Sequence, residues 1–169
     1  MTVDSFKFLP RIIATFYQQQ KIVARLPIPW TPLTKPLSKC RFGLVCSGGL
    51  YHKGIEPSFD MEREQVDPTW GDPSYRTIPI NIQQDELGVS HLHINPSAAL
   101  EDINVMLPLT RFSELAQQGV IGNIAQNAFS FMGYQGFPPT TEAWENVYGP
   151  QVAKKLQEEG VDCVMLIPA

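Results

Sequence analysis

The sequence predicts a single α/β domain with a mostly parallel open sheet flanked by helices. Short apolar runs of strand length alternate with helix-like stretches, and the clearest runs are Arg41 to Cys46 and Val161 to Ile167. The chain has 169 residues, of which 43% are hydrophobic, so it can bury one sizeable core. We therefore assign residues 1–169 to one domain, with an N-terminal helix and a proline-rich strap in residues 1–38.

The N-terminal segment predicts a helix followed by an extended strap. Apolar side chains recur at three- and four-residue steps between Phe6 and Arg25, which indicates an amphipathic helix that begins near Asp4 or Ser5. Four prolines follow between residues 26 and 37. Proline fixes φ and lacks a backbone donor, so this stretch is expected to run extended rather than helical.

The rest of the chain alternates between the two kinds of element. Further strands are expected at 75–80, 88–94 and 103–108, and helices at 96–102 with Ser97 as its cap, at 108–119 and at 140–160. The polar segment 56–76 is long enough to be a functional loop. Aromatic residues and glycines share 129–138, which predicts a core-lining loop or a pocket wall. The last helix, Gly160 and a buried edge strand at 161–167 form the back half of a βαβ unit.

Composition excludes several classes of protein. The formal net charge is −4 and the basic residues form no run, so a nucleic-acid partner is not expected. No apolar stretch approaches the roughly 20 residues of a membrane span, and the start lacks a basic region ahead of an apolar one, which predicts a cytoplasmic protein. The three cysteines include no CxxC pair, so neither a disulfide scaffold nor a cysteine metal site is expected.

Candidate site residues gather where the first predicted strand ends. Cys46 closes that strand, and Gly48 and Gly49 follow within three residues. Adjacent glycines after a strand allow a tight turn and the close approach of a backbone or a ligand. The segment has neither GxGxxG nor GxxxxGK[ST], so no nucleotide cofactor is expected.

Two histidines provide the strongest local chemical feature. His91 and His93 are two residues apart on a predicted strand, so both rings would project from one face. Such a pair can chelate a metal, hold a substrate carboxylate or hydrogen-bond to backbone, and Asn95, Glu101 or Asp102 could add oxygen ligands. Because no third ligand is fixed by spacing, we assign no metal.

Several stretches, in order along most of the chain, resemble the selenoprotein B subunits of glycine, sarcosine, betaine and D-proline reductases. They are Ile28-Pro29-Trp30-Thr31-Pro32-Leu33 with Lys35-Pro36-Leu37, Leu44-Val45-Cys46-Ser47-Gly48-Gly49-Leu50-Tyr51, Gly71-Asp72-Pro73-Ser74-Tyr75-Arg76-Thr77-Ile78-Pro79, Ser90-His91-Leu92-His93, residues 102–112, Gly119-Val120-Ile121-Gly122, Ser130-Phe131-Met132-Gly133-Tyr134 and residues 160–166. The resemblance implies reductive cleavage of a carbon–nitrogen bond, in which a selenolate or thiolate attacks the substrate and a nearby thiol resolves the adduct. It also implies partner subunits of a reductase-like complex.

The resemblance raises a question about the redox group. In the family, a selenocysteine or cysteine in a UxxC-like stretch follows the strand that matches residues 161–167, and this sequence ends at Ala169 without one. We expect either a chain cut at a codon read as stop or a scaffold with reduced or lost activity. Cys163, predicted to be buried in the strand, is a poor thiolate, so Cys46 is the better candidate nucleophile.

Two functions remain open at this point. In the first, the chain is a reductase-type subunit in which a small carboxylate or amine is bound by His91, His93, His52, Arg76, Gly48 and Gly49. In the second, it is a non-catalytic binding or assembly protein that acts through protein partners. A missing nucleophile removes an enzyme's mechanism but leaves a binding protein intact.

Overall fold

A computed structural model describes residues 7, 9–19 and 30–168, and its contacts divide the chain into two units, residues 1–32 and 33–169. The first unit holds α1 (Arg11–Gln19), in which the Ala14 amide donates to the Pro10 carbonyl over 2.9 Å. The helix begins later than expected because the residue before a proline disfavours helical backbone. Asp4 and Ser5, the expected caps, lie outside the described residues. The assignment of residues 1–169 to one domain stays a prediction.

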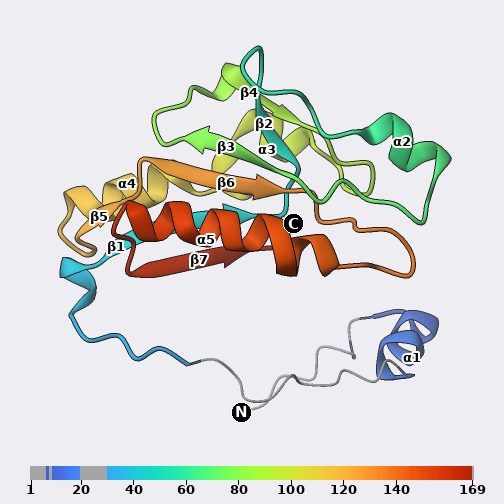
Figure 1. Ribbon diagram of the computed structural model, residues 1–169, viewed down its shortest axis with the longest axis horizontal. Helices are drawn as coiled ribbons and strands as arrows, with labels where there is room; N and C mark the ends of the chain where they lie inside the picture. Colours follow the sequence, from blue (N-terminus) through green and yellow to red (C-terminus); the bar gives the residue numbers. More distant parts are fainter. Residues whose placement is uncertain (1–6, 8, 20–29, 169) are drawn as a thin grey trace. The chain divides into compact units, whose positions relative to one another are not determined.

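The second unit is built on β1 (Arg41–Cys46), which pairs in parallel on both of its edges. Val45 and Cys46 pair both with β6 (Asn127–Phe131) and with β7 (Cys163–Ile167), so these two strands flank β1 (Figure 1). The short β5 (Asn123–Ile124) pairs in parallel with the start of β1, and β3 (Tyr75–Pro79) pairs antiparallel with β6. The predicted α/β class with a mostly parallel sheet is confirmed.

Two predicted strands are wrong in extent or kind. The strand expected at 88–94 is only β4 (Leu87–Val89), which pairs antiparallel with β2 (Leu50–His52). The apolar stretch 103–108 is not a strand, because Ile103–Val105 forms the 3₁₀ helix η4. The Asp102 side chain caps this turn by accepting from the Asn104 amide, and the Gln84 side chain accepts from the Ile103 amide. A prediction from the spacing of apolar residues does not take such local capping hydrogen bonds into account.

Three predicted helices are present: α3 (Ser97–Glu101), α4 (Leu109–Gln117), and the last helix, which consists of the π-helical turn η5 (Trp144–Tyr148) and α5 (Gly149–Glu158). Helix α2 (Met61–Val66) was not predicted and lies in the segment expected to be a loop, and the 3₁₀ turns η2 (Leu37–Lys39) and η3 (Gln84–Glu86) were not predicted either. Ser97 is the first helical residue of α3 and not its cap, since the Asn95 side chain accepts from the Ser97 amide over 3.0 Å. None of the described helices is long and apolar enough to cross a lipid bilayer.

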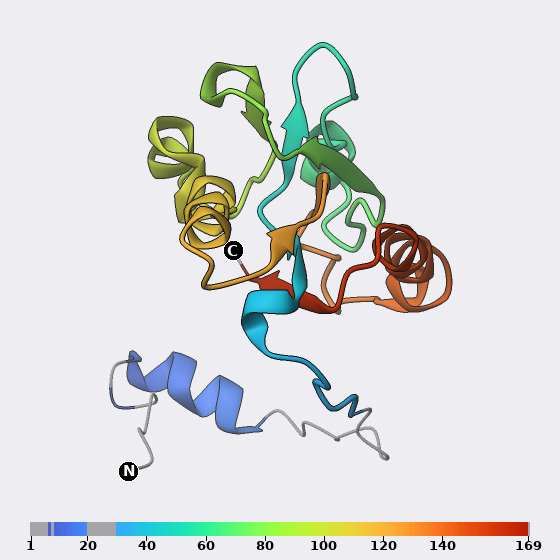
Figure 2. The ribbon, with the colours of Figure 1, turned by 90° about the vertical axis from the view of Figure 1, so that its left-hand side faces the viewer.

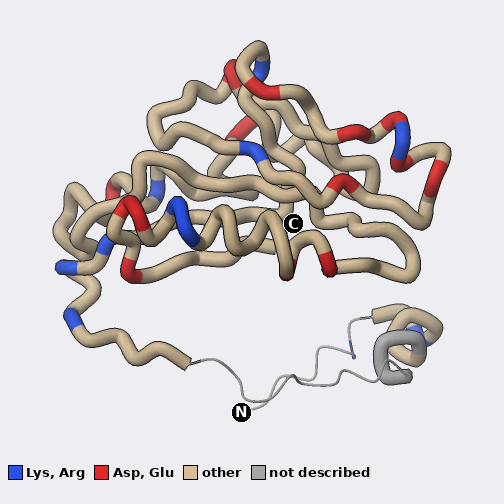
Figure 3. The backbone as a smooth tube through the Cα atoms, in the orientation of Figure 1, with Lys and Arg blue, Asp and Glu red and all other residues tan. Residues whose placement is uncertain are grey.

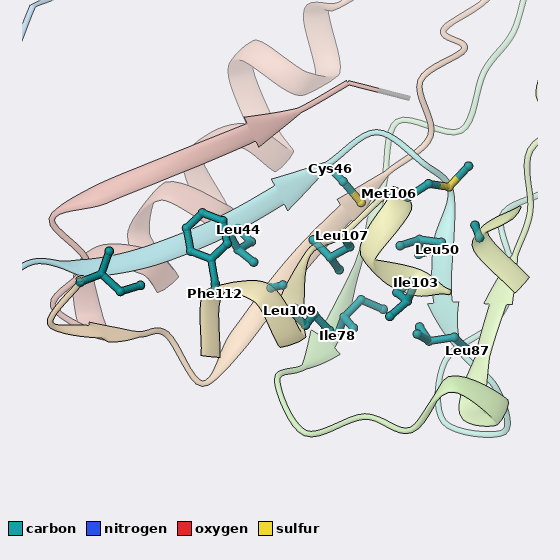
Figure 4. Packing of buried hydrophobic residues seen from close by; sticks show 13 residues of the cluster. Leu44, Cys46, Leu50, Ile78, Leu87, Ile103, Met106, Leu107, Leu109 and Phe112 are labelled. Carbon is teal, nitrogen blue, oxygen red and sulfur yellow. The ribbon is translucent and has the colours of Figure 1, made fainter. Parts of the chain in front are cut away.

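Helices cover the two faces of the sheet, α5 on one and α3 with α4 on the other (Figure 2). Alternation along β1 sends Leu44 and Cys46 into the larger core under α3 and α4 (Figure 4), while Val45 packs against the smaller core with Val152 and Leu156 of α5. Gly43 faces α5 at such short range that a Cβ there would lie 2.6 Å from the Leu156 side chain. A side chain at position 43 would therefore displace the Leu156 side chain of α5.

β7 lies at the edge of the sheet, as predicted, but is not buried. The exposed fractions of Val164, Met165 and Leu166 are 45%, 43% and 71%. Among the described strands only β1 pairs with β7, which leaves its outer edge uncovered. β6 and β7 carry no charged residue, and the charges lie mainly on turns and helices (Figure 3). The edge strand thus presents apolar side chains to the surroundings.

We expect Leu44→Ala to lower the free energy of unfolding by about 2–5 kcal/mol, because it empties a core position that is 2% exposed. Leu166→Ala, one strand away, is the matched control and should cost less than about 0.5 kcal/mol. Urea denaturation of both variants measures the difference. Equal losses would contradict the described packing of β1 and β7.

Candidate functional site

The turn after β1 forms the floor of the candidate site. The Gly49 amide donates to the Phe131 carbonyl and the Gly49 carbonyl accepts from the Ser90 amide, each over 2.8 Å. Gly49 has a φ of +65°, and a Cβ there would lie 2.3 Å from the Ser90 carbonyl oxygen. Gly48 forms a bridge with Met132. The two glycines therefore allow three segments of the chain to meet. The groups that come close to these glycines are backbone atoms of the other two segments.

His91 and His93 lie in a turn beyond β4, which corrects the prediction that they share one face of a strand. The turn still brings the rings together, with centroids 6.0 Å apart. The His93 amide donates to His91 Nδ1 over 3.2 Å, so the neutral His91 ring carries its proton on Nε2. This hydrogen bond uses the backbone amide that strand pairing would need, so the strand ends before His91. It also orients the His91 ring.

Glu64 of α2 completes the cluster from a distant part of the sequence. Its Oε1 lies 2.8 Å from His93 Nε2, whereas its Oε2 is buried without a hydrogen-bond partner among the described residues. Burial raises the pKa of Glu64; the hydrogen bond and charge of His93 oppose the rise, and the Asp72 carboxylate adds to it. The result is a buried carboxylate behind a histidine whose side chain is 48% exposed.

The loop after β6 encloses the histidines from the other side. The Tyr134 ring lies against the His93 ring with centroids 4.2 Å apart, and the Tyr134 hydroxyl donates to the Pro68 carbonyl. A Cβ on Gly133 would lie 3.3 Å from His91 Nε2, so the loop passes close to that nitrogen. The predicted aromatic and glycine-rich wall at 129–138 is thus partly strand β6 and partly this cover.

Arg76 is buried and all five of its N–H groups are engaged. They donate to the Pro57, Ser58 and Tyr75 carbonyls, the Ser74 hydroxyl and the Asp72 carboxylate. Its guanidinium also lies 4.1 Å above the Phe59 ring. These contacts hold the segment that leads into α2, and so place Glu64. In this geometry Arg76 positions the site without offering a donor to a ligand.

Cys46 and His52 stand apart from the histidine cluster. Cys46 is 2% exposed among core side chains (Figure 4), and its thiol donates to the Ser130 hydroxyl over 3.4 Å. Burial raises the pKa of Cys46, although the Ser130 contact and a backbone hydrogen bond at Gly48 oppose the rise. His52 closes β2 opposite Leu87, at the end of that strand away from Gly49.

Within the described part of the chain, no three histidine, cysteine or acidic side chains are grouped so that they can hold a metal ion. The imidazole rings and the carboxylate of the cluster can form hydrogen bonds and exchange protons. Burial, followed by the positive charge of nearby His93, lowers the pKa of His91 from its ordinary value of 6.5. His91 is accordingly neutral at pH 7.

An apolar groove lies on the α5 face of the sheet. It has a volume of about 880 Å³ and is lined by side chains that include Phe131, Trp144, Val152, Leu156, Val164 and Leu166. Cys46 and Ser47 reach its end, where β1 and β7 stop. The groove and the histidine cluster thus adjoin the same carboxyl edge of the parallel strands, where ligands bind in open α/β sheets.

Sequence reasoning singled out both histidines but missed Glu64 and Tyr134. Glu64 is one of two glutamates in a short polar helix, and nothing local distinguishes it from its neighbour Glu62. Only its contact with His93, 29 positions away, marks it as a site residue. Tyr134 belongs to the predicted wall at 129–138 and to the stretch 130–134 that resembles the family, but neither indicated its contact with His93.

These features define an α/β protein with a histidine and carboxylate site at the carboxyl edge of a mostly parallel sheet. Residues 14–169 match the family model of the glycine/sarcosine/betaine reductase selenoprotein B. The chain belongs to this family, which confirms the resemblance seen in the sequence.

Curated relatives carry the same kind of name. The D-proline reductase subunit gamma of Acetoanaerobium sticklandii is 33% identical over 140 residues, which cover 83% of this chain and 53% of the relative. The glycine reductase complex component B subunit gamma of Carboxydothermus hydrogenoformans is 27% identical, over 82% of this chain and 30% of the relative. For the sarcosine reductase complex component B subunit beta of Peptoclostridium acidaminophilum the identity is 28%, with the same two shares. The chain thus matches about half or less of each relative, and no solved structure gives a significant match.

We expect His91→Gln to change how stability depends on pH. Because the folded-state pKa of His91 lies below 6.5, the unfolded chain takes up a proton first as the pH falls. The stability of the unmodified protein relative to His91→Gln should therefore fall as the pH drops below about 6.5, with a slope of at most about 1.4 kcal/mol per pH unit.

Urea unfolding between pH 7 and pH 5 measures this difference. His52→Gln is the matched control, and it should keep the pH dependence because His91 is still present. If His91→Gln and the unmodified protein gave parallel curves, His91 would not be a neutral, desolvated ring in the folded state.

Proposed function

We propose that the chain forms the substrate-holding part of a reductase subunit that acts on a small amine or amino carboxylate. The observation that carries this proposal is the pair formed by buried Glu64 and half-exposed His93, with His91 beside it. Membership of a family whose members are named as glycine, sarcosine and D-proline reductase subunits supports the substrate class.

The Glu64 and His93 pair suits the handling of a proton. With Nε2 directed at Glu64, Nδ1 is the ring nitrogen left for a ligand. Ionised Glu64 favours a proton on Nε2, so Nδ1 accepts a proton in the neutral ring and donates one in the charged ring. Reductive cleavage of a carbon–nitrogen bond needs a proton for the departing amine, and we assign its delivery to His93.

His91 has a different role in this proposal. Its Nδ1 is occupied by the His93 amide and its ring is neutral, so its Nε2–H is the donor that remains. A neutral donor binds a carboxylate oxygen without exchanging its proton. We propose that His91 orients the substrate and that Arg76, Gly48 and Gly49 position the surrounding segments.

The reducing group is not assigned to the described part of the chain. Cleavage consumes two electrons, which in the proposed family chemistry come from a selenolate or thiolate and a resolving thiol. Burial raises the pKa of both Cys46 and Cys163, and this disfavours the reactive thiolate. We therefore propose that these 169 residues bind substrate but have reduced or no reductase activity by themselves.

A second candidate function is that of a binding or assembly protein. The exposed apolar side chains of β7 and the adjoining groove favour it, because contiguous apolar surface often marks a protein interface. The names of the relatives place those proteins in reductase complexes. In this alternative, another subunit covers β7 and the histidine site is secondary.

We propose a cytoplasmic location for either function. The three cysteines are free thiols in the structure. Unpaired cysteines are typical of compartments kept reducing by cellular thiols.

If the histidines hold the substrate, His91→Ala combined with His93→Ala should abolish binding of sarcosine and D-proline, the two probe compounds. Loss of one hydrogen bond to a charged group corresponds to about 1.5–3 kcal/mol, so each single variant should weaken binding roughly 10-fold to 100-fold. Calorimetric titration measures the affinity, and His52→Ala serves as the control with unchanged binding. Unchanged affinity in a cooperatively folding double variant would exclude this site.

We also expect the 169-residue protein to release no amine from sarcosine when a dithiol is the only reductant. The reason is that neither Cys46 nor Cys163 is poised as a thiolate. A specific assay for the released amine tests this expectation. Turnover that disappears in Cys46→Ser would show instead that the chain is an enzyme with Cys46 as its nucleophile.

A further inference from the structure

We propose that a second copy of this chain docks on the edge strand β7, so that the two β7 strands pair antiparallel and the sheets of both copies become continuous. The inference develops the second candidate function, that of an assembly protein, by naming what covers β7. It does not depend on the histidine site.

The two outermost strands of the sheet differ in how their outer edges are protected. On β3, the Thr77 amide donates to the Glu56 carboxylate over 2.9 Å, so a side chain occupies that edge. On β7, only β1 pairs with the strand among the described residues, and residues 163–167 include neither a charged residue nor a proline. Charges and prolines are the usual protection of an edge against pairing. The outer edge of β7 is therefore open to another strand.

The hydrogen bonds of β7 show which backbone groups face this open edge. The Ser47 amide donates to the Ile167 carbonyl over 3.1 Å, so Ile167 faces β1. Backbone groups of successive residues alternate between the two edges of a strand, so Val164 and Leu166 direct their amides and carbonyls outward. The side chains of the same two residues line the apolar groove on the α5 face. Val164 and Leu166 thus offer both hydrogen-bonding groups and apolar surface to a partner.

This edge is complementary to itself. When two β7 strands meet antiparallel about a two-fold axis at Met165, Val164 of one copy lies opposite Leu166 of the other. The outward amide and carbonyl of each then bond to those of its opposite residue. The Met165 residues face each other as a pair without hydrogen bonds between them. Both copies use the same residues, as a two-fold interface requires.

The charge and exposure of the strand also fit a second copy. Val164 and Leu166 are 45% and 71% exposed, and in this arrangement they pack against their counterparts on one face of the joined sheet. No charged side chain lies on β7, so two identical strands bring no like charges together, although the chain has a net charge of −4. The adjacent carboxylate of Asp162 is paired with Lys35 at 2.7 Å. Pro168 lacks an amide and ends the ladder.

Sedimentation equilibrium of the reduced 169-residue chain, over roughly 1 µM to 1 mM, tests the interface. We expect the mass to rise from that of one chain to that of two. Leu166→Lys should weaken association at least about 100-fold, because symmetry removes two buried leucines from each interface. Ile55→Lys changes a similarly exposed apolar residue on a turn, and as the matched control it should leave association unchanged.

A mass of one chain at every concentration would overturn the proposal and leave the edge to a different polypeptide. A dimer that Leu166→Lys does not weaken would also overturn it, because the copies would then meet through another surface.

Cross-linking tests the register independently. Met165→Cys in a Cys163→Ser background should form a disulfide-linked dimer on mild oxidation. The Cα atoms of such an antiparallel pair lie about 4.5 Å apart, within the range that a disulfide spans. Ile55→Cys in the same background is the control and should stay unlinked. Peptide mapping should find position 165 linked to position 165, and a link through Cys40 or Cys46 instead would contradict the register.

The outcome is separate from that of the histidine site. Leu166→Lys should bind sarcosine with the affinity of the unmodified protein, because it changes none of the residues proposed to hold the substrate. Failure of the dimer therefore leaves the proposed substrate site standing, and failure of substrate binding leaves the dimer standing.

Discussion

The rest of the structure depends on the hydrogen bonding of β1 along both of its edges. β6 and β7 both pair with Val45 and Cys46, so the strand is fixed in the middle of the sheet while its side chains alternate between two cores. That position determines where residues 47–49 leave the sheet. The Ser90 backbone then lies so close to Gly49 that a side chain at position 49 would not fit. The location of His91 is thus a consequence of strand pairing more than 40 residues earlier in the chain.

The same constraint explains which parts of the molecule were predictable. Strands β1, β3 and β7 and helix α4 follow from local apolar patterns in the sequence. The strand expected around His91 and His93 fails because a side chain, His91 Nδ1, satisfies the backbone amide that a ladder would have used. Glu64 could not be predicted at all, since its importance comes only from a contact across 29 positions. β7 was expected to be a buried edge strand, and it is exposed because apolar composition does not show whether other elements cover such a strand.

The buried carboxylate of Glu64 is an unfavourable element unless another role offsets it. Burial opposes its ionisation, and one oxygen lacks a hydrogen-bond partner among the described residues. The five hydrogen bonds of Arg76 and the ring contact with Phe59 hold the preceding segment in place and supply the rigidity that keeps Glu64 there. Perturbed carboxylates fixed behind a partly exposed histidine are more typical of functional sites than of cores.

Binding chemistry and thiol chemistry occupy different places in this unit. The histidines, Glu64 and Tyr134 lie near the carboxyl end of β1, while Cys40 precedes its first residue and Cys163 pairs with Phe42 near its start. Cys46 is the one cysteine near the histidine end, and it faces the core with a raised pKa. If the proposed function holds, the electron pair for carbon–nitrogen cleavage has to come from a group other than these three thiols. The parallel strands β1, β6 and β7 all direct their carboxyl ends to the same edge of the sheet, so a reducing group delivered at that edge would meet the proposed substrate there.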